Sequence, residues 1–281
     1  MTTGTEDLLE IERAELMFMP SGIDRLDREV RLLGSVDVLV YGRTQEVPGL
    51  RRKSLLAALA LNPGQVVSND LLIDTVWSGG APATVSNTLQ SHISYLRRIL
   101  GGPDAILMSS PGYRLNTALI GTDAQVAEQL IRQARQTDDL DQRLGCLRKA
   151  LSLWRGVPLS GVRAHASLNE NGERLERVHT VAMKSMVETE LKLGLLSAAI
   201  PRLQDMLVEY PFDEELHAQL MLALYRAGRQ VEALAVFRRL RAALIAELAI
   251  EPSRKLRDLQ EAILRQDPSM EPEPAQLDLA I

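Results

Sequence analysis

The stretch QVVSNDLLIDTVWSGGAPATVSNTLQSHISYLRRILGG, residues 65–102, decides how this chain folds. Ser68 is a residue type that caps helix N-termini, and it precedes an amphipathic run that ends at Trp77. A second helix is predicted over residues 84–100, because apolar side chains recur there at steps of three to four: Val85, Leu89, Ile93, Leu96 and Leu100. The loop SGGAP joins the two helices. The stretch therefore predicts a helix-turn-helix.

Segments on both sides extend this motif. VRLLGSVDVLVYG (30–42) alternates and predicts a strand pair or a bent strand, and RRKSLLAALALNPG (51–64) predicts a short helix. AILMSSPGYRLN (105–116) predicts a hairpin, because two extended runs flank a Ser-Ser-Pro-Gly turn. Strands, helices and a final hairpin in this order are typical of a winged helix.

The pattern changes to helices alone from about residue 122. Helices are predicted over 123–136, 139–154, 167–194, 196–209, 213–227, 230–248 and 253–265. Gly194 and Gly228 mark two similar helix–helix turns 34 residues apart, which is the tetratricopeptide period. The repeats are degenerate, because Pro211 follows the first glycine by 17 residues and Pro252 follows the second by 24.

These patterns predict the fold class and the domains. We expect an α+β winged helix-turn-helix N-terminal domain followed by an all-α tetratricopeptide-like domain. The predicted boundaries are an acidic, disordered extension (1–29), the winged helix (30–118), the helical domain (122–268) and a disordered tail (269–281).

The net charge of −5 by itself argues weakly against nucleic-acid binding, but the charges are unevenly distributed along the chain. Residues 1–30 carry three Lys/Arg and eight Asp/Glu, and residues 266–281 carry four acidic residues and no basic one. Residues 31–121 carry eight Lys/Arg against five Asp/Glu. The winged-helix segment is thus mildly basic, as a DNA-binding domain requires.

Several other classes of protein are disfavoured. The chain has no phosphate-binding loop, dinucleotide fingerprint or nucleophile elbow, and its four histidines stand at no metal-ligand spacing. A single cysteine excludes a disulfide framework, and no apolar run reaches the roughly 18 residues of a membrane span. We expect no enzyme activity, no cofactor, no metal and no membrane partner.

The outward face of the helix at 84–100 points to DNA. It carries Gln and Ser, which hydrogen-bond to base edges, followed by Arg97 and Arg98, which suit backbone phosphates. A solvated amphipathic helix is the alternative for this segment taken alone. The preceding helix and the following wing favour DNA binding.

The same residues carry a resemblance to a known family. The segment GLRRKSLLAALALNPG through HISYLRRILG, with SSPGYRLN, resembles the OmpR-type winged helix of the Streptomyces antibiotic regulatory proteins (SARPs). LSLWRGVPLSGV, ETELKLG and HAQLMLALYRAGRQVEALAVF resemble that family's bacterial transcriptional activation domain. The resemblance covers roughly residues 30–268 and is to the small class of the family.

The resemblance implies an activator of an antibiotic or secondary-metabolite gene cluster in an actinomycete. Its implied partners are double-stranded promoter DNA with direct repeats and the RNA polymerase holoenzyme. The polymerase contacts would be region 4 of the primary sigma factor and other subunits. A homodimer on DNA and a cytoplasmic, nucleoid-associated location are also implied.

The resemblance also implies site residues. The base-contact set is Thr88, Gln90, Ser91, Ser94 and Tyr95, and the phosphate-contact set is Arg51, Arg52, His92, Arg97, Arg98 and Arg114. The wing set is Ser109, Ser110, Gly112 and Tyr113, and the polymerase-facing loop is Trp77, Ser78, Gly79, Gly80, Ala81 and Pro82. Ser109 stands where the family usually has an arginine that contacts the minor groove, so this chain has no arginine at that position for the contact.

Two alternative functions remain open. The first is a ligand-gated regulator that senses a pathway intermediate in the helical domain. The second is a tetratricopeptide scaffold whose winged helix binds protein.

Overall fold

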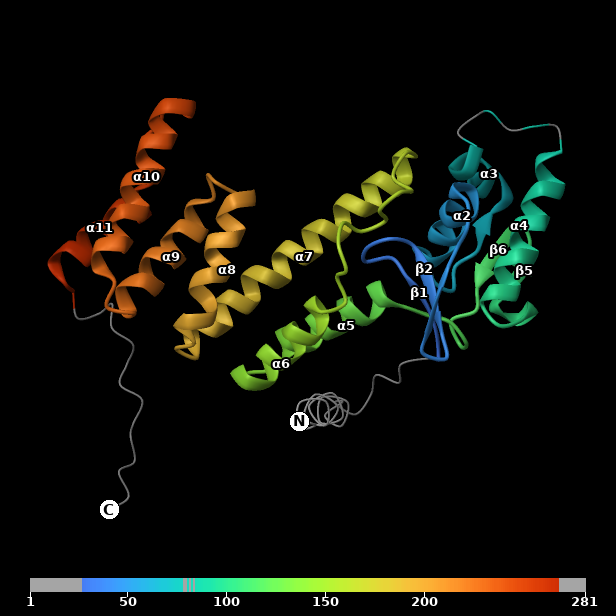
Figure 1. Cartoon of the computed structure of the whole chain (residues 1–281), viewed down its shortest axis with the longest axis horizontal. Helices are drawn as coiled ribbons and strands as arrows, with labels where there is room; N and C mark the ends of the chain where they lie inside the picture. The colour runs from blue at the N-terminus through green and yellow to red at the C-terminus, as the bar shows by residue number, and fades with distance from the viewer. Residues whose placement is uncertain (1–26, 78–79, 81, 83, 268–281) are drawn as a thin grey trace, which may run out of the picture. The chain divides into compact units, whose positions relative to one another are not determined.

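A computed structural model describes residues 27–77, 80, 82 and 84–267 (Figure 1). The chain divides into two compact units. The first unit comprises Met1–Leu130 and Lys149–His179, and the second comprises Ile131–Arg148 and Thr180–Ile281. Strands and short helices come first and helices follow, so the predicted fold class is confirmed.

The first unit opens with a small sheet in the order β3-β2-β1-β7. Strands β1 (Arg28–Arg31), β2 (Asp37–Val40) and β3 (Arg43–Glu46) are antiparallel, and β7 (Gly121–Thr122) pairs in parallel with β1. Valines at alternate positions of β2 are buried, which is the pattern that predicted a strand. Strand β1 begins at Arg28, so it includes the last two residues of the predicted 1–29 extension.

The helix-turn-helix and its wing follow this sheet. Helices α2 (Leu50–Ala60), α3 (Asn69–Trp77) and α4 (Val85–Ile99) correspond to the three predicted helices. A short 3-10 turn (Pro103–Ala105) leads into β5 (Ile106–Ser109) and β6 (Gly112–Leu115), which form the predicted hairpin.

Strand β4 (Val67–Ser68) completes the wing sheet in the order β4-β6-β5. The close pairing of β4 with β6 depends on Gly112. A Cβ atom at this position would lie 1.9 Å from the carbonyl oxygen of Val67, which no side chain tolerates. The glycine therefore permits the strands to pair.

A leucine-rich core holds the winged helix together. Helix α2 buries Leu55, Leu56 and Leu59 completely, and α4 buries Leu89, Ile93 and Leu96. The buried face of α4 is the apolar stripe that its sequence periodicity predicted. Burying side chains of this kind contributes roughly 1.5–3 kcal/mol each.

The remaining helices are α5 (Asp123–Gln136), α6 (Leu140–Leu151), α7 (Ala166–Lys192), α8 (Leu196–Glu209), α9 (Glu214–Arg226), α10 (Gln230–Leu248) and α11 (Arg254–Arg265). Gly194 and Gly228 adopt φ values of 71° and 73° at matching helix–helix turns, in agreement with the predicted repeat. Ala199 and Ala233, one helical turn later, are fully buried.

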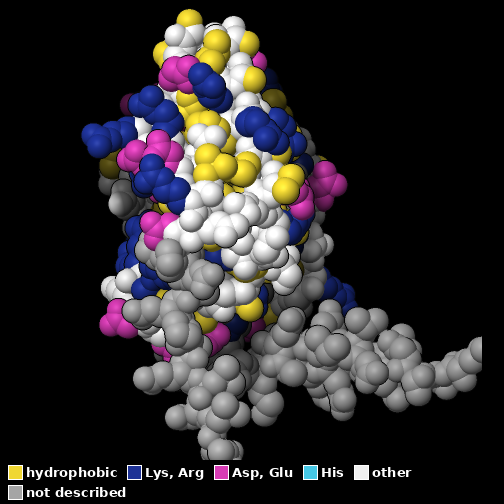
Figure 2. Space-filling view, turned by 90° about the vertical axis from the view of Figure 1, so that its left-hand side faces the viewer, with side chains coloured by type: hydrophobic (Ala, Val, Ile, Leu, Met, Phe, Trp, Pro, Cys, Tyr) yellow, Lys and Arg dark blue, Asp and Glu magenta, His cyan; other side chains and the backbone are white. Residues whose placement is uncertain are grey.

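The second unit packs α9 against both α8 and α10. Glu190 of α7 is fully buried there, and Arg202 of α8 donates to its carboxylate at 3.3 Å. Figure 2 looks onto the side where α10 and α11 lie and shows hydrophobic side chains between flanks of Lys and Arg. Exposed hydrophobic residues of these helices include Val231, Ile245 and Leu264.

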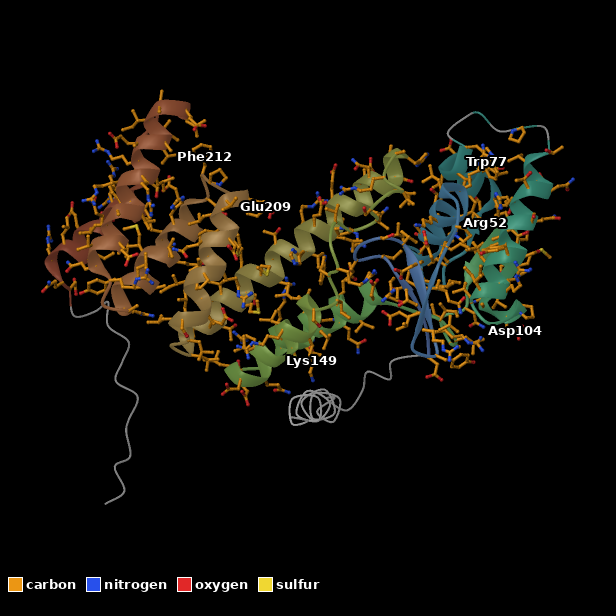
Figure 3. The ribbon with its side chains drawn as sticks, in the orientation of Figure 1. Arg52, Trp77, Asp104, Lys149, Glu209 and Phe212 are labelled. Atoms are coloured by element: carbon orange, nitrogen blue, oxygen red, sulfur yellow. The ribbon has the colours of Figure 1, made fainter. Side chains whose placement is uncertain are left out.

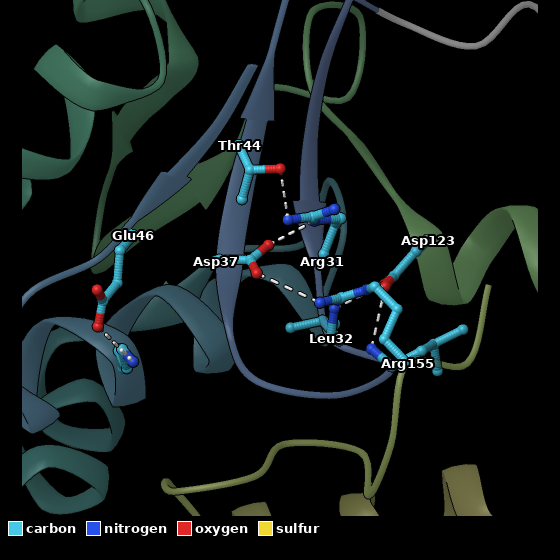
Figure 4. A network of polar contacts seen from close by, with 9 residues as sticks. Arg31, Leu32, Asp37, Thr44, Glu46, Asp123 and Arg155 are labelled. Atoms are coloured by element: carbon cyan, nitrogen blue, oxygen red, sulfur yellow. Dashed lines mark hydrogen bonds and ion pairs between the residues drawn. The ribbon is translucent and has the colours of Figure 1, made fainter. Parts of the chain in front are cut away.

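Within the first unit, the start of α5 is bonded to the small sheet (Figure 4). The backbone N–H groups of Leu32 and Leu33 donate to the Asp123 carboxylate at 2.7 and 3.0 Å. Arg155 donates to the carboxylates of Asp37 and Asp123 at 3.2 and 3.3 Å. Burial raises the pKa of Asp123 to about 6, against the lowering effect of its two backbone hydrogen bonds.

The segment after α6 also contacts this sheet. Arg155 and Leu159 donate backbone hydrogen bonds to the carbonyls of Leu33 and Leu32 at 2.8 and 2.9 Å. The first compact unit therefore crosses the sequence boundary predicted at residues 118–122. The domain boundaries stay a prediction, and the predicted 269–281 tail lies outside the described residues.

Across the described residues, no helix combines the length and apolar composition that crossing a membrane requires. In the same residues, no three His, Cys, Asp or Glu side chains gather closely enough to hold a metal ion.

Candidate nucleic-acid interface

Helix α4 presents one exposed row opposite its buried stripe. Asn87, Ser91, Ser94 and Arg98 follow one another at steps of four, three and four, and all are exposed. Asn87 was missing from the predicted site. Its spacing from Ser91 was a usable signal, and asparagine can bond bidentately to adenine. Gln90 is also exposed and lies beside this row.

Two of the predicted base contacts are engaged within the protein. Thr88 is half-buried, and its hydroxyl donates to the carbonyl of Thr84 at 3.1 Å. Tyr95 is half-buried and packs against the core of the first unit. The structure thus separates the five predicted base contacts into three exposed residues and two that already have protein neighbours.

Two arginines approach the ring of Tyr95. The guanidinium carbon of Arg52, near the start of α2, lies 4.0 Å from the ring centroid. That of Arg98, one turn further along α4, lies 5.1 Å away. Figure 3 labels Arg52 in the region where α2 and α4 meet. Among the described residues, neither arginine forms an ion pair with a carboxylate.

Arg51 belongs to a second stack. Its guanidinium carbon lies 5.7 Å from the ring of Trp77, the last residue of α3. Trp77 in turn stacks on His92 of α4, with ring centroids 6.1 Å apart and an interplanar angle of 16°. The two stacks place three predicted phosphate contacts, Arg51, Arg52 and Arg98, along the junction of α2 with α4.

His92 is turned inward by this stacking. Both of its ring nitrogens are buried, and neither has a hydrogen-bond partner among the described residues. Burial lowers the pKa of His92, and the charges of Arg52 and Arg51 lower it further. The predicted contact of His92 with a phosphate is therefore not supported by its placement, because no ring nitrogen reaches the surface.

Arg97 lies on the wing side of α4. Its Nε donates to the carbonyl of Ile106 at 2.8 Å, and its guanidinium carbon lies 6.0 Å from the ring of Tyr113. Arg97 thus fastens strand β5 to α4. Its phosphate contact stays a prediction, and so does that of Arg114, which is half-buried on β6.

The predicted wing residues also include both exposed and buried positions. Ser110 is exposed at the turn and Ser109 is half-buried, whereas Gly112 and Tyr113 are buried and support the hairpin. In the loop before α4, Trp77 is buried and Gly80 donates to its carbonyl at 3.0 Å. Pro82 is exposed, and Ser78, Gly79 and Ala81 lie outside the described residues.

Two segments of the chain match known protein families. Residues 122–264 match the family described as the bacterial transcriptional activator domain. Residues 50–115 match the family described as transcriptional regulatory protein, C terminal.

Relatives share both segments. The chain is 34% identical to the regulatory protein DnrI of Streptomyces peucetius, over 86% of this chain and 94% of DnrI. It is 34% identical to the regulatory protein AfsR of Streptomyces griseus, over 80% of this chain but 24% of AfsR. The solved structure of Mycobacterium tuberculosis EmbR with a low affinity phosphopeptide is similar at a TM-score of 0.75 and 29% identity. That similarity covers 87% of this chain and 66% of the EmbR chain.

Proposed function

The chain belongs to the Streptomyces antibiotic regulatory protein family of transcriptional regulators, and from this membership we propose that it activates an antibiotic or secondary-metabolite gene cluster. It binds direct repeats near the promoter as a homodimer and recruits RNA polymerase. The similarity to the Streptomyces regulatory proteins DnrI and AfsR supports this proposal.

One observation carries the DNA-binding part of the proposal. Helix α4 has no acidic residue in its 15 positions, and its exposed row of Asn87, Ser91, Ser94 and Arg98 consists of groups that bond to bases or phosphates. An ordinary surface helix has no need of such a face. The face suits an α-helix inserted in the major groove.

The exposed residues make two kinds of contact with DNA, to base edges and to phosphates. Asn87, Gln90, Ser91 and Ser94 bond to base edges and give sequence specificity. Arg51, Arg52 and Arg98 contact phosphates on the backbone and give affinity that falls with salt. The loop at Gly80 and Pro82, between α3 and α4, contacts the polymerase.

DNA selected from random duplexes tests the base contacts. The full chain is expected to enrich one direct repeat, and binding is then measured by fluorescence anisotropy. Asn87→Ala and Gln90→Ala are each expected to cost roughly 1–3 kcal/mol on the selected site and little on random DNA. Arg254→Ala, an exposed change on α11, is the matched control. If no sequence is enriched, specific DNA binding is disproved.

Transcription in a reconstituted system tests polymerase recruitment. Pro82→Ala is expected to leave the footprint on the promoter unchanged and to lower the amount of transcript. If transcript falls only when the footprint also weakens, the loop has no separate role in polymerase contact.

An open pocket on the second unit favours a second candidate function, ligand-gated regulation. It has a volume of about 270 Å³ and is lined by Gln204, Leu207, His217, Leu220, Val236 and Arg239. Among the described residues, Arg239 is the one cation of this lining and the leucines and Val236 are apolar, so a small carboxylate with an apolar body matches it. A ligand-dependent rise in Tm tests this candidate. Leu220→Trp, which fills the cavity, should abolish that rise.

A further inference from the structure

We propose that Tyr95 is a positioning residue, whose ring holds Arg52 and Arg98 ready to bind DNA phosphates, rather than a residue that bonds to a base. This inference rests on the DNA-binding function proposed above. It assigns to Tyr95 a role different from the one that the family resemblance implies.

The geometry brings together residues that are distant in sequence. Arg52 comes from α2 and Arg98 from α4, and their guanidinium carbons lie 4.0 and 5.1 Å from the centroid of the Tyr95 ring. Both distances are within the roughly 6 Å at which a cation is attracted to an aromatic face. The ring is thus the common neighbour of two cations on two helices.

The charges around the ring are unbalanced. Neither Arg52 nor Arg98 is paired with a carboxylate among the described residues. Burial lowers the pKa of His92 on the same helix, and the charges of Arg52 and Arg51 lower it further. Two guanidinium groups around one ring leave a local positive charge, and a backbone phosphate supplies the matching negative charge.

Fixing the arginines before binding has a physical advantage. A free arginine loses rotamer freedom when it grips a phosphate, and that loss weakens binding. A side chain already held against a ring loses less. Tyr95 packs against the core of the first unit, which restricts its ring and lets it support both arginine side chains.

The competing role for Tyr95 is a hydrogen bond from its hydroxyl to a base edge. The two roles depend on different parts of the side chain. Tyr95→Phe keeps the ring and removes the hydroxyl, whereas Tyr95→Leu keeps apolar volume and removes the ring. Tyr41, which lies 5.5 Å from the guanidinium carbon of Arg28 on the small sheet, gives the matched control Tyr41→Leu.

The experiment measures DNA affinity of the full chain at several salt concentrations, on the selected site and on random duplexes. Each lost phosphate contact makes the slope of log K against log salt shallower by about 0.9. For Tyr95→Leu we expect the slope to change by less than about 0.9, because both arginines are still present and can reach phosphates. We expect affinity at 0.1 M salt to fall roughly two- to tenfold for each arginine that must now be ordered on binding, equally on both DNAs. Tyr95→Phe and Tyr41→Leu should match the unmodified chain.

Other results would overturn the proposal. A loss confined to the selected site for Tyr95→Phe, with an unchanged slope, would assign Tyr95 to base recognition. An unchanged affinity on both DNAs for a folded Tyr95→Leu would remove any role for the ring. If Tyr95→Leu does not fold, Arg52→Gln and Arg98→Gln replace it, and each must make the slope shallower by about 0.9. If the unmodified chain shows no salt-dependent binding to any DNA, the proposed function itself fails.

Discussion

Trp77 stacks on His92, with the two ring centroids 6.1 Å apart, and this contact joins the last residue of α3 to the middle of α4. The contact predicts a structural role for His92. His92→Ala should lower the free energy of unfolding by roughly 1 kcal/mol, because an aromatic pair contributes about 0.5–1.5 kcal/mol. Denaturation in urea measures this change. The salt slope of DNA binding should not change, and a shallower slope would reinstate His92 as a phosphate contact.

Gly112→Ala is expected to disrupt the wing. The added Cβ would lie 1.9 Å from the Val67 carbonyl oxygen, so β4 and β6 must separate. We expect a loss of roughly 3 kcal/mol, at the upper end for overpacking. Gly145→Ala in α6 is the control, because its Cβ would meet nothing within 4 Å. That change should stabilise the protein by roughly 0.5–1 kcal/mol. Equal effects of the two substitutions would contradict the close approach of β4 to β6.

The ionisation of Asp123 should make the free energy of unfolding depend on pH between about 4 and 7. Its folded-state pKa of about 6 is above the ordinary value of 3.8, so the folded protein binds more protons than the unfolded chain between these values. The contribution of Asp123 to the free energy of unfolding is therefore unfavourable above pH 6 and improves as the pH falls toward 3.8. The full change is about 3 kcal/mol.

Asp123→Asn isolates this signature, because the other titrating groups are common to both proteins. The stability of the unmodified protein relative to the variant should rise as the pH is lowered from 7 to 4. A difference that stays constant over this range would show that Asp123 is charged throughout, stabilised by its two backbone hydrogen bonds and Arg155.

Arg202→Ala should destabilise the second unit strongly. Glu190 is fully buried, and its carboxylate accepts from Arg202 at 3.3 and 3.4 Å. Removing one partner of a buried ion pair costs roughly 3–5 kcal/mol. Arg202 is 30% exposed and Arg148 lies 3.9 Å from the same carboxylate, so we expect about 2–3 kcal/mol. Arg265→Ala, which breaks an exposed pair with Glu261, should cost less than about 0.5 kcal/mol in the same urea measurement. Similar costs for both would show that Glu190 is stabilised by other groups.

Periodicity predicted the helices because burial of one face is a local property of the sequence. The stripe of Leu89, Ile93 and Leu96 on α4 is an example, and so are the matching turns at Gly194 and Gly228. The two-residue strand β7, and the hydrogen bonds that Leu32 and Leu33 donate to Asp123 at the start of α5, could not be predicted in this way. The partners are about 90 residues apart, and no local pattern connects them.

The candidate site was predicted less completely than the helix that carries it. Helical periodicity predicted that Gln90, Ser91 and Ser94 are exposed, and the structure agrees. The same periodicity also predicts that Asn87, one turn earlier, is exposed. It could not give the directions of His92 and Arg97. Those depend on Trp77 and on the Ile106 carbonyl, which belong to other elements.

The bonds of Asp123 to the small sheet have a consequence for the spacing of operators. These bonds fix the start of α5 to the small sheet of the first unit. In the proposed complex, the direction in which α5 leaves the winged helix is therefore set by how α4 lies in the major groove. If two copies bind direct repeats as proposed, we expect them to face the same way only when their sites are in phase with the DNA helix, at multiples of about 10–10.5 base pairs. Inserting half a turn of DNA between the repeats should send the two copies to opposite sides and abolish their cooperation.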